Sequence, residues 1–169
     1  MIVQALTRDG VTLRFCEEGQ RQSPETLVFA NSLGTDLRIW LDVIRAFRDT
    51  KRIVRYDKRG HGMSDAPDAP YSLDDHVDDL DALLEHLEID DAIVVGVSVG
   101  GMIAQGLALK SPERVRGLVR CDTAAKIGTY DAWDERIEAI RSGGLEAIAD
   151  GIDLLPEFRS MLIERVRLI

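Results

Sequence analysis

The feature that most constrains the fold is a serine between glycines, at the junction of an apolar strand and an apolar helix. Gly96-Val97-Ser98-Val99-Gly100 follows the apolar segment 92–95 and leads into the mostly apolar segment 99–110. A strand, a tight turn and a helix in this order hold a serine with its hydroxyl exposed, and the flanks need glycine because side chains there would collide. We therefore predict that Ser98 is a nucleophile. The alternative is that the glycines allow close packing and Ser98 is the N-cap of the helix.

Strand-like and helix-like segments alternate up to Cys121, which predicts an α/β fold with a mainly parallel sheet covered by helices on both faces. The pair Asp9-Gly10 is typical of a hairpin turn. The expected strands are residues 2–6, 11–17, 26–30, 52–56, 92–95 and 115–121, and the expected helices are residues 36–47, 73–87 and 99–110.

After Cys121 the pattern becomes helical. The expected helices there are residues 133–141, 145–155 and 158–169, and no further strand follows them. We therefore expect residues 1–123 to form the N-terminal part of a core and residues 124–169 to form a partial helical cap.

The loop Asn31-Ser32-Leu33-Gly34-Thr35-Asp36 follows the expected strand 26–30 and precedes a helix that Thr35 or Asp36 can cap. A nucleophilic serine of this kind takes a second oxyanion donor from the loop after the third strand. We assign the backbone N–H of Leu33 as one donor and that of Val99 as the other. The alternative is an ordinary capped loop.

Composition and charge disfavour several classes of function. The chain has 21 Lys and Arg against 30 Asp and Glu residues, a net charge of −9, which disfavours nucleic acid and anionic membranes as partners. No apolar run reaches the ~18 residues of a membrane span, so we expect a soluble cytoplasmic protein. The three histidines lack metal-ligand spacing, so we expect no metal. Cys16 and Cys121 lie in strand-like runs, where we expect reduced core residues.

Four segments together resemble the 3-oxoadipate enol-lactonases, which are α/β-hydrolases. The segments are NSLGTDLRIW at 31–40, YDKRGHGMSDAP at 56–67, GVSVGGM at 96–102 and DTAAKIGT at 122–129. The D-x-R-G-H-G-x-S and G-x-S-x-G-G patterns are shared across α/β-hydrolases, whereas N-S-L-G-T-D and T-A-A-K-I-G-T are more particular to the lactonases. The resemblance covers about residues 1–150 and is lost from about Asp153 onward.

The resemblance implies an α/β-hydrolase fold and hydrolysis of 3-oxoadipate enol-lactone in the bacterial degradation of aromatic compounds, without a cofactor. It implies that Ser98 attacks the lactone carbonyl while a histidine, oriented by an acid, takes its proton and later activates water. In that family the acid and the histidine follow the cap, with C-terminal strands that we expect to be absent from this chain. A second chain or a missing C-terminal part is therefore expected to complete the fold. Asp122 is a weak candidate for the acid.

None of the three histidines is a good candidate for the base. His61 precedes Ser98, whereas α/β-hydrolases place the histidine after the serine, and a histidine between two glycines of a tight turn is more often structural. His76 and His86 are weaker candidates still. They lie on the expected helix 73–87, whose many acidic residues we expect to form a solvated face.

The candidate substrate contacts lie in the cap and in the loop 31–36. Trp133 is expected to face the substrate, with core packing as the alternative, and Ser32 is a further candidate. Lys126 and Arg136 are candidate partners of a substrate carboxylate, against ordinary surface charge. Two other functions stay open: a broader-specificity esterase of the same fold, and a catalytically incomplete fragment or binding domain without the triad histidine.

Overall fold

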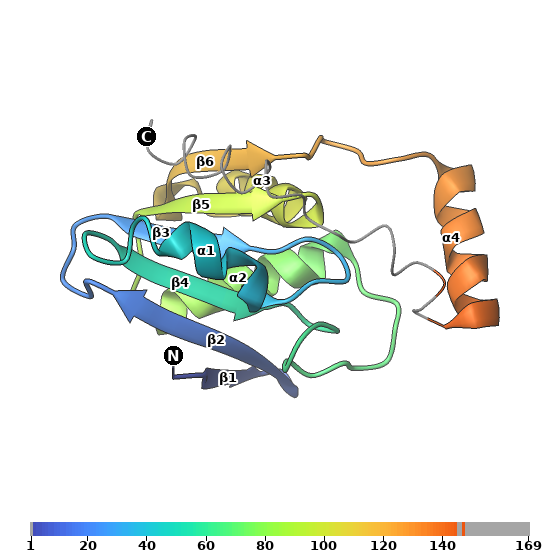
Figure 1. Ribbon diagram of the computed structural model, residues 1–169, viewed down its shortest axis with the longest axis horizontal. Helices are drawn as coiled ribbons and strands as arrows, with labels where there is room; N and C mark the ends of the chain where they lie inside the picture. The colour runs from blue at the N-terminus through green and yellow to red at the C-terminus, as the bar shows by residue number, and fades with distance from the viewer. Residues whose placement is uncertain (1, 145–146, 148–169) are drawn as a thin grey trace.

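The centre of the fold is a six-stranded sheet whose strands lie in the order β1-β2-β4-β3-β5-β6. The computed structural model describes residues 2–144 and residue 147 (Figure 1). The strands are β1 Gln4–Arg8, β2 Val11–Gly19, β3 Thr26–Ala30, β4 Arg52–Asp57, β5 Ala92–Val97 and β6 Val115–Cys121. Neighbours among β4, β3, β5 and β6 pair in parallel, whereas β2 pairs antiparallel with β1 and β4. The predicted α/β fold with a mainly parallel sheet is therefore confirmed.

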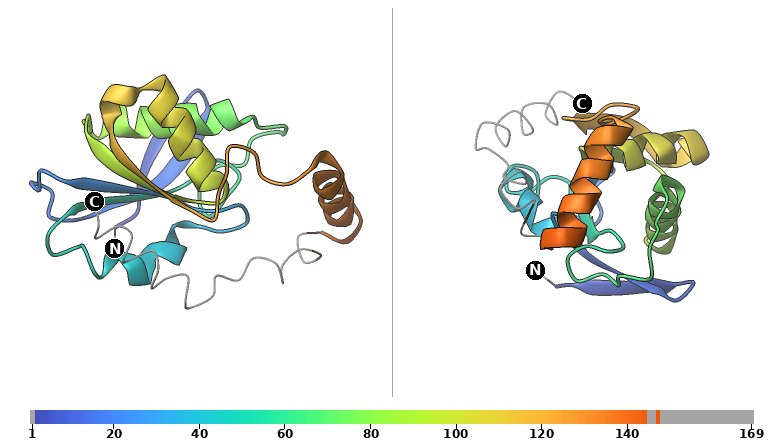
Figure 2. Two further views of the ribbon diagram at one scale, coloured as in Figure 1. Left: turned by 90° about the horizontal axis from the view of Figure 1, so that it is seen from above. Right: turned by 90° about the vertical axis from the view of Figure 1, so that its right-hand side faces the viewer.

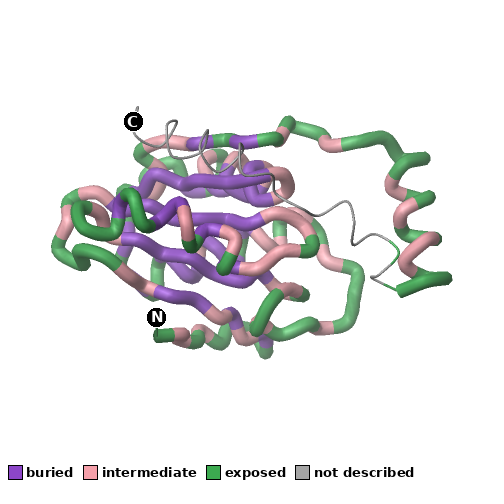
Figure 3. Tube along the Cα trace, viewed as in Figure 1, coloured by how far each residue is buried: buried purple, intermediate pink, exposed green. Residues whose placement is uncertain are grey.

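Helices cover both faces of this sheet (Figure 2). The helices α2 Leu73–His86 and α3 Val99–Lys110 pack on one face, and the 3-10 helix η1 Leu37–Trp40 and the helix α1 Leu41–Ile44 pack on the other. Successive side chains of the parallel strands point to opposite faces of the sheet. Val28 therefore packs with α2 and α3, while Phe29 packs with η1 and α1. Figure 3 shows that the inner strands are largely buried, and this burial on both faces explains why β5 and most of β3 are apolar.

The expected helix 36–47 is wrong as a single element, because the structure divides it into η1 and α1. Leu37, Trp40 and Val43 are three residues apart, and this spacing fits the 3.0-residue turn of a 3-10 helix as well as an α-helix. Asp36 caps η1, since its carboxylate accepts a hydrogen bond from the Arg38 N–H at 2.8 Å.

The acidic face of α2 is not only a solvated surface. Asp79 is 5% exposed. Its carboxylate accepts two hydrogen bonds from the Arg59 guanidinium, from Nε at 2.7 Å and from Nη2 at 2.8 Å. Arg59 lies in the loop after β4, so this ion pair ties that loop to α2. A buried carboxylate requires such a partner, because an unpaired charge there would cost several kcal/mol, roughly.

The helix α4 Tyr130–Gly143 follows β6 and stands apart from the sheet (Figure 1). It begins three residues before the expected start because the Thr129 side chain caps it by accepting from the Ala132 N–H at 3.3 Å. The expected helices 145–155 and 158–169 lie outside the described residues, so the division into a core and a cap stays a prediction. Among the described residues, none of the helices combines the length and apolarity of a membrane span.

Candidate active site

Ser98 occupies a strained turn between β5 and α3. Its backbone has φ 53 and ψ −122, a conformation that L-residues rarely adopt. Two hydrogen bonds hold it: the Ser98 N–H donates to the Cys121 carbonyl at 3.0 Å, and the Thr123 hydroxyl donates to the Ser98 carbonyl at 2.7 Å. The Ser98 side chain makes no capping hydrogen bond to α3. The geometry therefore does not support an N-cap role and leaves the hydroxyl available for chemistry.

Both flanking glycines are required by close backbone contacts. A Cβ atom on Gly96 would lie 2.4 Å from the Gly100 carbonyl oxygen, and one on Gly100 would lie 2.0 Å from the Ala30 carbonyl oxygen. Neither backbone oxygen can move without shifting α3 against the sheet. Glycine at these positions lets the start of α3 approach the end of β3, which brings Val99 toward the loop 31–36.

The loop 31–36 is shaped by its own side chains and by two residues of the neighbouring loop after β4. Within the loop, the Thr35 hydroxyl donates to the Ser32 carbonyl at 3.0 Å. From the neighbouring loop, the Lys58 ammonium donates to the same carbonyl at 2.8 Å, and His61 Nε2 accepts from the Gly34 N–H at 3.1 Å. Leu33 lies between these two anchor points.

His61 has a structural role in this arrangement. Its Nδ1 lies 3.0 Å from the Arg59 carbonyl, which can only accept, so Nδ1 donates and Nε2 is free to accept from Gly34. Burial, helped by the positive charge of Lys58, lowers the pKa of His61 and keeps the ring neutral. These contacts support the expectation that His61 is not the base.

Lys58 is a residue that the sequence analysis did not single out. Its side chain has no exposed surface, and burial lowers its pKa to about 7 although Asp57 and Asp36 act in the opposite direction. The signal that could have found it is its position: Lys58, Asn31 and Ser98 follow the adjacent parallel strands β4, β3 and β5 at the same edge of the sheet.

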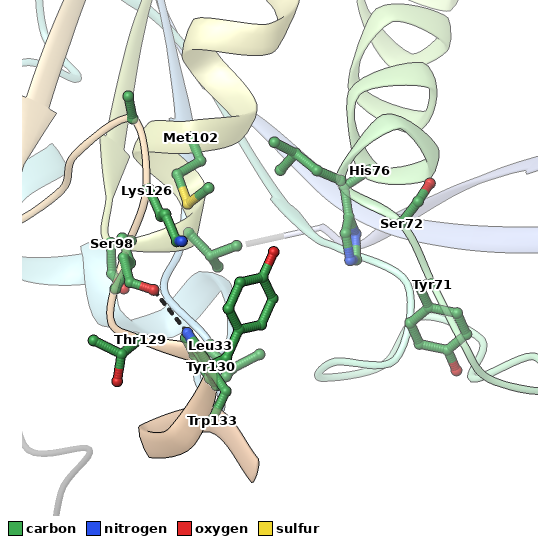
Figure 4. Close-up of a pocket in the computed structure, with 14 residues that line it drawn as sticks. Leu33, Tyr71, Ser72, His76, Ser98, Met102, Lys126, Thr129, Tyr130 and Trp133 are labelled. Atoms are coloured by element: carbon green, nitrogen blue, oxygen red, sulfur yellow. Dashed lines mark hydrogen bonds between the residues drawn. The ribbon is translucent and has the colours of Figure 1, made fainter. Parts of the chain in front are cut away.

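A cavity of about 500 Å³ opens beside Ser98 (Figure 4). It brings together five of the predicted residues: Ser98, Leu33, Val99, Lys126 and Trp133. It also contains residues that were not predicted, among them Tyr71, His76, Met102 and Tyr130. Figure 4 shows Ser98 and Lys126 on one side and His76 with Tyr71 on the other. Most of the wall is apolar, as in sites for small organic ligands.

The loop between β6 and α4 forms one side of this cavity. Trp133 is fixed by a hydrogen bond from its indole Nε1 to the Ile127 carbonyl at 2.7 Å. The Lys126 ammonium lies 4.6 Å from the centre of the Tyr130 ring, which is within reach of a cation–π contact. Trp133 and Lys126 therefore reach the cavity from the segment that the sequence assigned to the cap.

Three predicted residues lie outside the cavity wall. Ser32 is half-buried within its loop, and Arg136 stacks on Trp133 with 5.7 Å between its guanidinium carbon and the ring centre. Asp122 is exposed at the end of β6 with φ 45. Of the described histidines only His76 lines the cavity, and burial lowers its pKa to about 4, helped by the charge of Lys58. In the described part of the chain, no group of three or more His, Cys, Asp or Glu side chains could hold a metal ion.

Comparison with known proteins places this geometry among hydrolases. Residues 25–157 match the family described as alpha/beta hydrolase fold. The chain is 43% identical to 3-oxoadipate enol-lactonase 2 and 36% identical to 3-oxoadipate enol-lactonase 1, both from Acinetobacter baylyi, over 85% of its own length. It superimposes on the crystal structure of the enol-lactonase from Burkholderia xenovorans LB400 with a TM-score of 0.84 and 31% identity, covering 95% of this chain and 66% of that one.

The chain spans 54% and 53% of the lengths of the two Acinetobacter lactonases, so about half of each has no counterpart in this sequence. The matched half contains the segment with Ser98 and the loop with Leu33.

Proposed function

The chain belongs to the α/β-hydrolase family, and from this premise we propose that it provides the nucleophile half of a serine hydrolase that opens 3-oxoadipate enol-lactone to 3-oxoadipate. The observation that carries the proposal is the strained turn that holds Ser98 at a cavity shared with Leu33 and Val99. The similarity to enol-lactonases supports the choice of substrate.

In the proposed mechanism, the Ser98 hydroxyl attacks the lactone carbonyl and loses its proton to a base. The N–H groups of Leu33 and Val99 stabilise the negative charge that develops on the carbonyl oxygen. The ring C–O bond breaks, the proton passes to the departing enol oxygen, and the acyl group stays on Ser98. The enol then tautomerises to the ketone, losing the proton on oxygen and gaining one on carbon. Water then attacks this ester, releasing 3-oxoadipate and restoring the serine.

We assign the base and its orienting acid to residues beyond this sequence, in a further part of the protein or in a second chain. No hydrogen bond joins Ser98 to any of the three histidines, all of which lie in the described part of the chain. His61 is engaged with the loop 31–36, and His76 lies across the cavity from Ser98 (Figure 4). Asp122, exposed at the end of β6, is the weaker alternative for the acid.

Lys126 is the proposed partner of the substrate carboxylate. It is the cation among the described lining residues, apart from His76, whose lowered pKa keeps it neutral at pH 7. The apolar wall formed by Trp133 and Met102 suits the carbon skeleton of the lactone. Arg136 orients Trp133 in this proposal and does not contact the substrate, because it lies outside the cavity wall.

The test is lactone opening by the full-length protein, followed by the loss of ultraviolet absorbance, in the wild type and in Ser98→Ala. The proposal expects rapid opening that falls by roughly 10⁴-fold or more in the variant, since a triad nucleophile supplies about that much. Ser142→Ala, on the exposed side of α4, is the matched control and should keep full activity. Undiminished opening by Ser98→Ala would refute the proposal.

A parallel assay of the same proteins on simple aryl esters separates the other two functions. Hydrolysis of simple aryl esters without lactone opening would indicate a broader esterase of the same fold. A folded full-length protein without activity on either substrate would indicate a binding domain.

A further inference from the structure

The buried side chain of Lys58 contacts the loop that carries the proposed oxyanion donor. Its ammonium donates to the Ser32 carbonyl oxygen at 2.8 Å, and none of its surface is exposed. Burying an ammonium is costly unless it is paired and hydrogen-bonded, and a long apolar side chain would fill the same space without that cost. The charge is therefore not explained by packing alone.

The carbonyl that Lys58 binds belongs to the same peptide group as the Leu33 N–H. A peptide group is planar and trans, so its carbonyl and its N–H point in opposite directions. Lys58 therefore lies at one end of this dipole, and the oxyanion that we assign to Leu33 would lie at the other. Donation to the carbonyl polarises the peptide and strengthens its N–H as a donor.

We propose that Lys58 is a positioning residue that fixes and polarises the Ser32–Leu33 peptide, so that the Leu33 N–H is aimed at the oxyanion formed on the Ser98 ester. This inference rests on the proposed function, because it assumes that Ser98 is acylated and that Leu33 is an oxyanion donor.

The contacts around this peptide show that both sides of Leu33 are anchored. Before Leu33, the Ser32 carbonyl also accepts from the Thr35 hydroxyl at 3.0 Å. After Leu33, the Gly34 N–H donates to His61 at 3.1 Å. Removing Lys58 would leave Thr35 as the other described donor to that carbonyl, a neutral hydroxyl in place of a charge, and the peptide would be held less firmly.

The charge of Lys58 is compensated from the end of β4 and from the loop 31–36. Asp57 and Asp36 are the carboxylates that act on it. Asp57 is fixed in turn, because it accepts from the Leu37 N–H at 2.7 Å and from the Met63 N–H at 2.9 Å. These carboxylates balance the charge of the ammonium, whose described hydrogen bond goes to the Ser32 carbonyl.

The test compares Lys58→Met, which keeps the length of the side chain but removes the donor, with Lys58→Gln, which keeps an uncharged donor. Both are made in the full-length protein and assayed on an aryl ester as well as on the lactone. Lys58→Met should lower kcat by roughly 10–100-fold, part of the 10²–10³ that an oxyanion donor provides, and should leave KM within about twofold. Lys58→Gln should recover part of the loss, and Lys110→Met, at the exposed end of α3, should change nothing.

A second measurement covers the case in which Lys58→Met does not fold. Thr35→Val removes the other donor to the same carbonyl and should lower kcat in the same way but less. In each folded variant, the affinity for phenylboronic acid, whose tetrahedral adduct mimics the transition state, should fall by the same factor as kcat/KM.

A rise in KM with unchanged kcat, or unchanged boronic acid affinity in the folded variants, would overturn the role of Lys58. A different result would refute the proposed function itself. A wild type that hydrolyses the aryl ester but not the lactone would refute the lactonase proposal, while the effect of Lys58 would still be measured on the ester.

Discussion

At the scale of single residues, the site depends on backbone that is held in an unfavourable shape. Ser98 keeps its left-handed conformation because the Cys121 carbonyl and the Thr123 hydroxyl anchor its peptide groups. The cost of such a conformation is about 1–2 kcal/mol for an L-residue and is nearly absent for glycine. The strain therefore lowers stability at the position of the proposed nucleophile.

This strain gives a stability prediction for a matched pair of variants. Ser98→Gly should have a free energy of unfolding about 1 kcal/mol higher than Ser98→Ala, because only alanine retains the Cβ atom that makes positive φ unfavourable. Urea unfolding of both inactive variants measures the difference. Equal free energies of unfolding for the two variants would show that the backbone conformation of Ser98 does not lower the stability of the protein.

The two histidines with lowered pKa values predict a pH dependence of stability. Burial, with a contribution from Lys58, lowers the pKa of His61 and lowers that of His76 to about 4. The unfolded chain then binds protons first, near pH 6.5, so the free energy of unfolding should decrease as the pH falls from about 6.5 toward 5. Protonation of His61 would also remove the acceptor of the Gly34 N–H.

Urea titrations at several pH values between 5 and 6.5 test this, because most carboxylates titrate below that window and Lys58, with a pKa of about 7, titrates mainly above it. The decrease should be smaller in His76→Gln than in the wild type. An equal decrease in both proteins would mean that His76 is not the group responsible.

At the scale of secondary structure, the sequence predicted best those elements whose pattern is fixed by burial. The bounds of β3, β6 and α3 agree with the prediction. For β3 and α3 the reason is that a mostly apolar run meets a turn signal at one end. The region after β3 differed because three-residue spacing does not separate a 3-10 helix from an α-helix. The strand β5 extends to Val97, two residues beyond the predicted end, because Gly96 was assigned to the turn.

The site was predictable where one segment carries its own motif, and not where distant segments meet. Ser98 and Leu33 could be proposed because each is part of a recognisable pattern after a strand, and both line the same cavity. Lys58 and His76 were missed because their places in the site depend on strand order and on how α2 packs, which the sequence of either segment does not contain.

The close contact between α3 and β3 predicts that a larger residue at Gly100 destabilises the fold. Gly100→Ala would place a Cβ atom 2.0 Å from the Ala30 carbonyl oxygen, so α3 must shift against the sheet. The free energy of unfolding should fall by about 2–4 kcal/mol, and activity should fall with it because Val99 moves too. Leu109→Ala, whose side chain is 87% exposed on the same helix, is the control and should stay within about 0.5 kcal/mol of the wild type.

At the scale of the whole molecule, the sheet ends on a strand that is paired on one side. Among the described strands, β6 pairs with β5, and its other edge has no described partner. An open strand edge is a template for pairing with another chain. The helix α4 adds no buried residue in the described structure and so does little to protect the core.

A polypeptide of residues 1–169, expressed alone, should therefore either associate or have a low thermal unfolding temperature. Light scattering coupled to size exclusion measures this directly. A monodisperse, stable monomer would show that the edge of β6 needs no further partner.

The role of Ser98 as nucleophile can be tested by covalent labelling of the full-length protein with a fluorophosphonate, followed by peptide mapping. We expect one label per chain on the Ser98 hydroxyl, none in Ser98→Ala, and slower labelling in Lys58→Met. A label on another residue of an active enzyme, or labelling that survives in Ser98→Ala, would show that Ser98 is not the nucleophile.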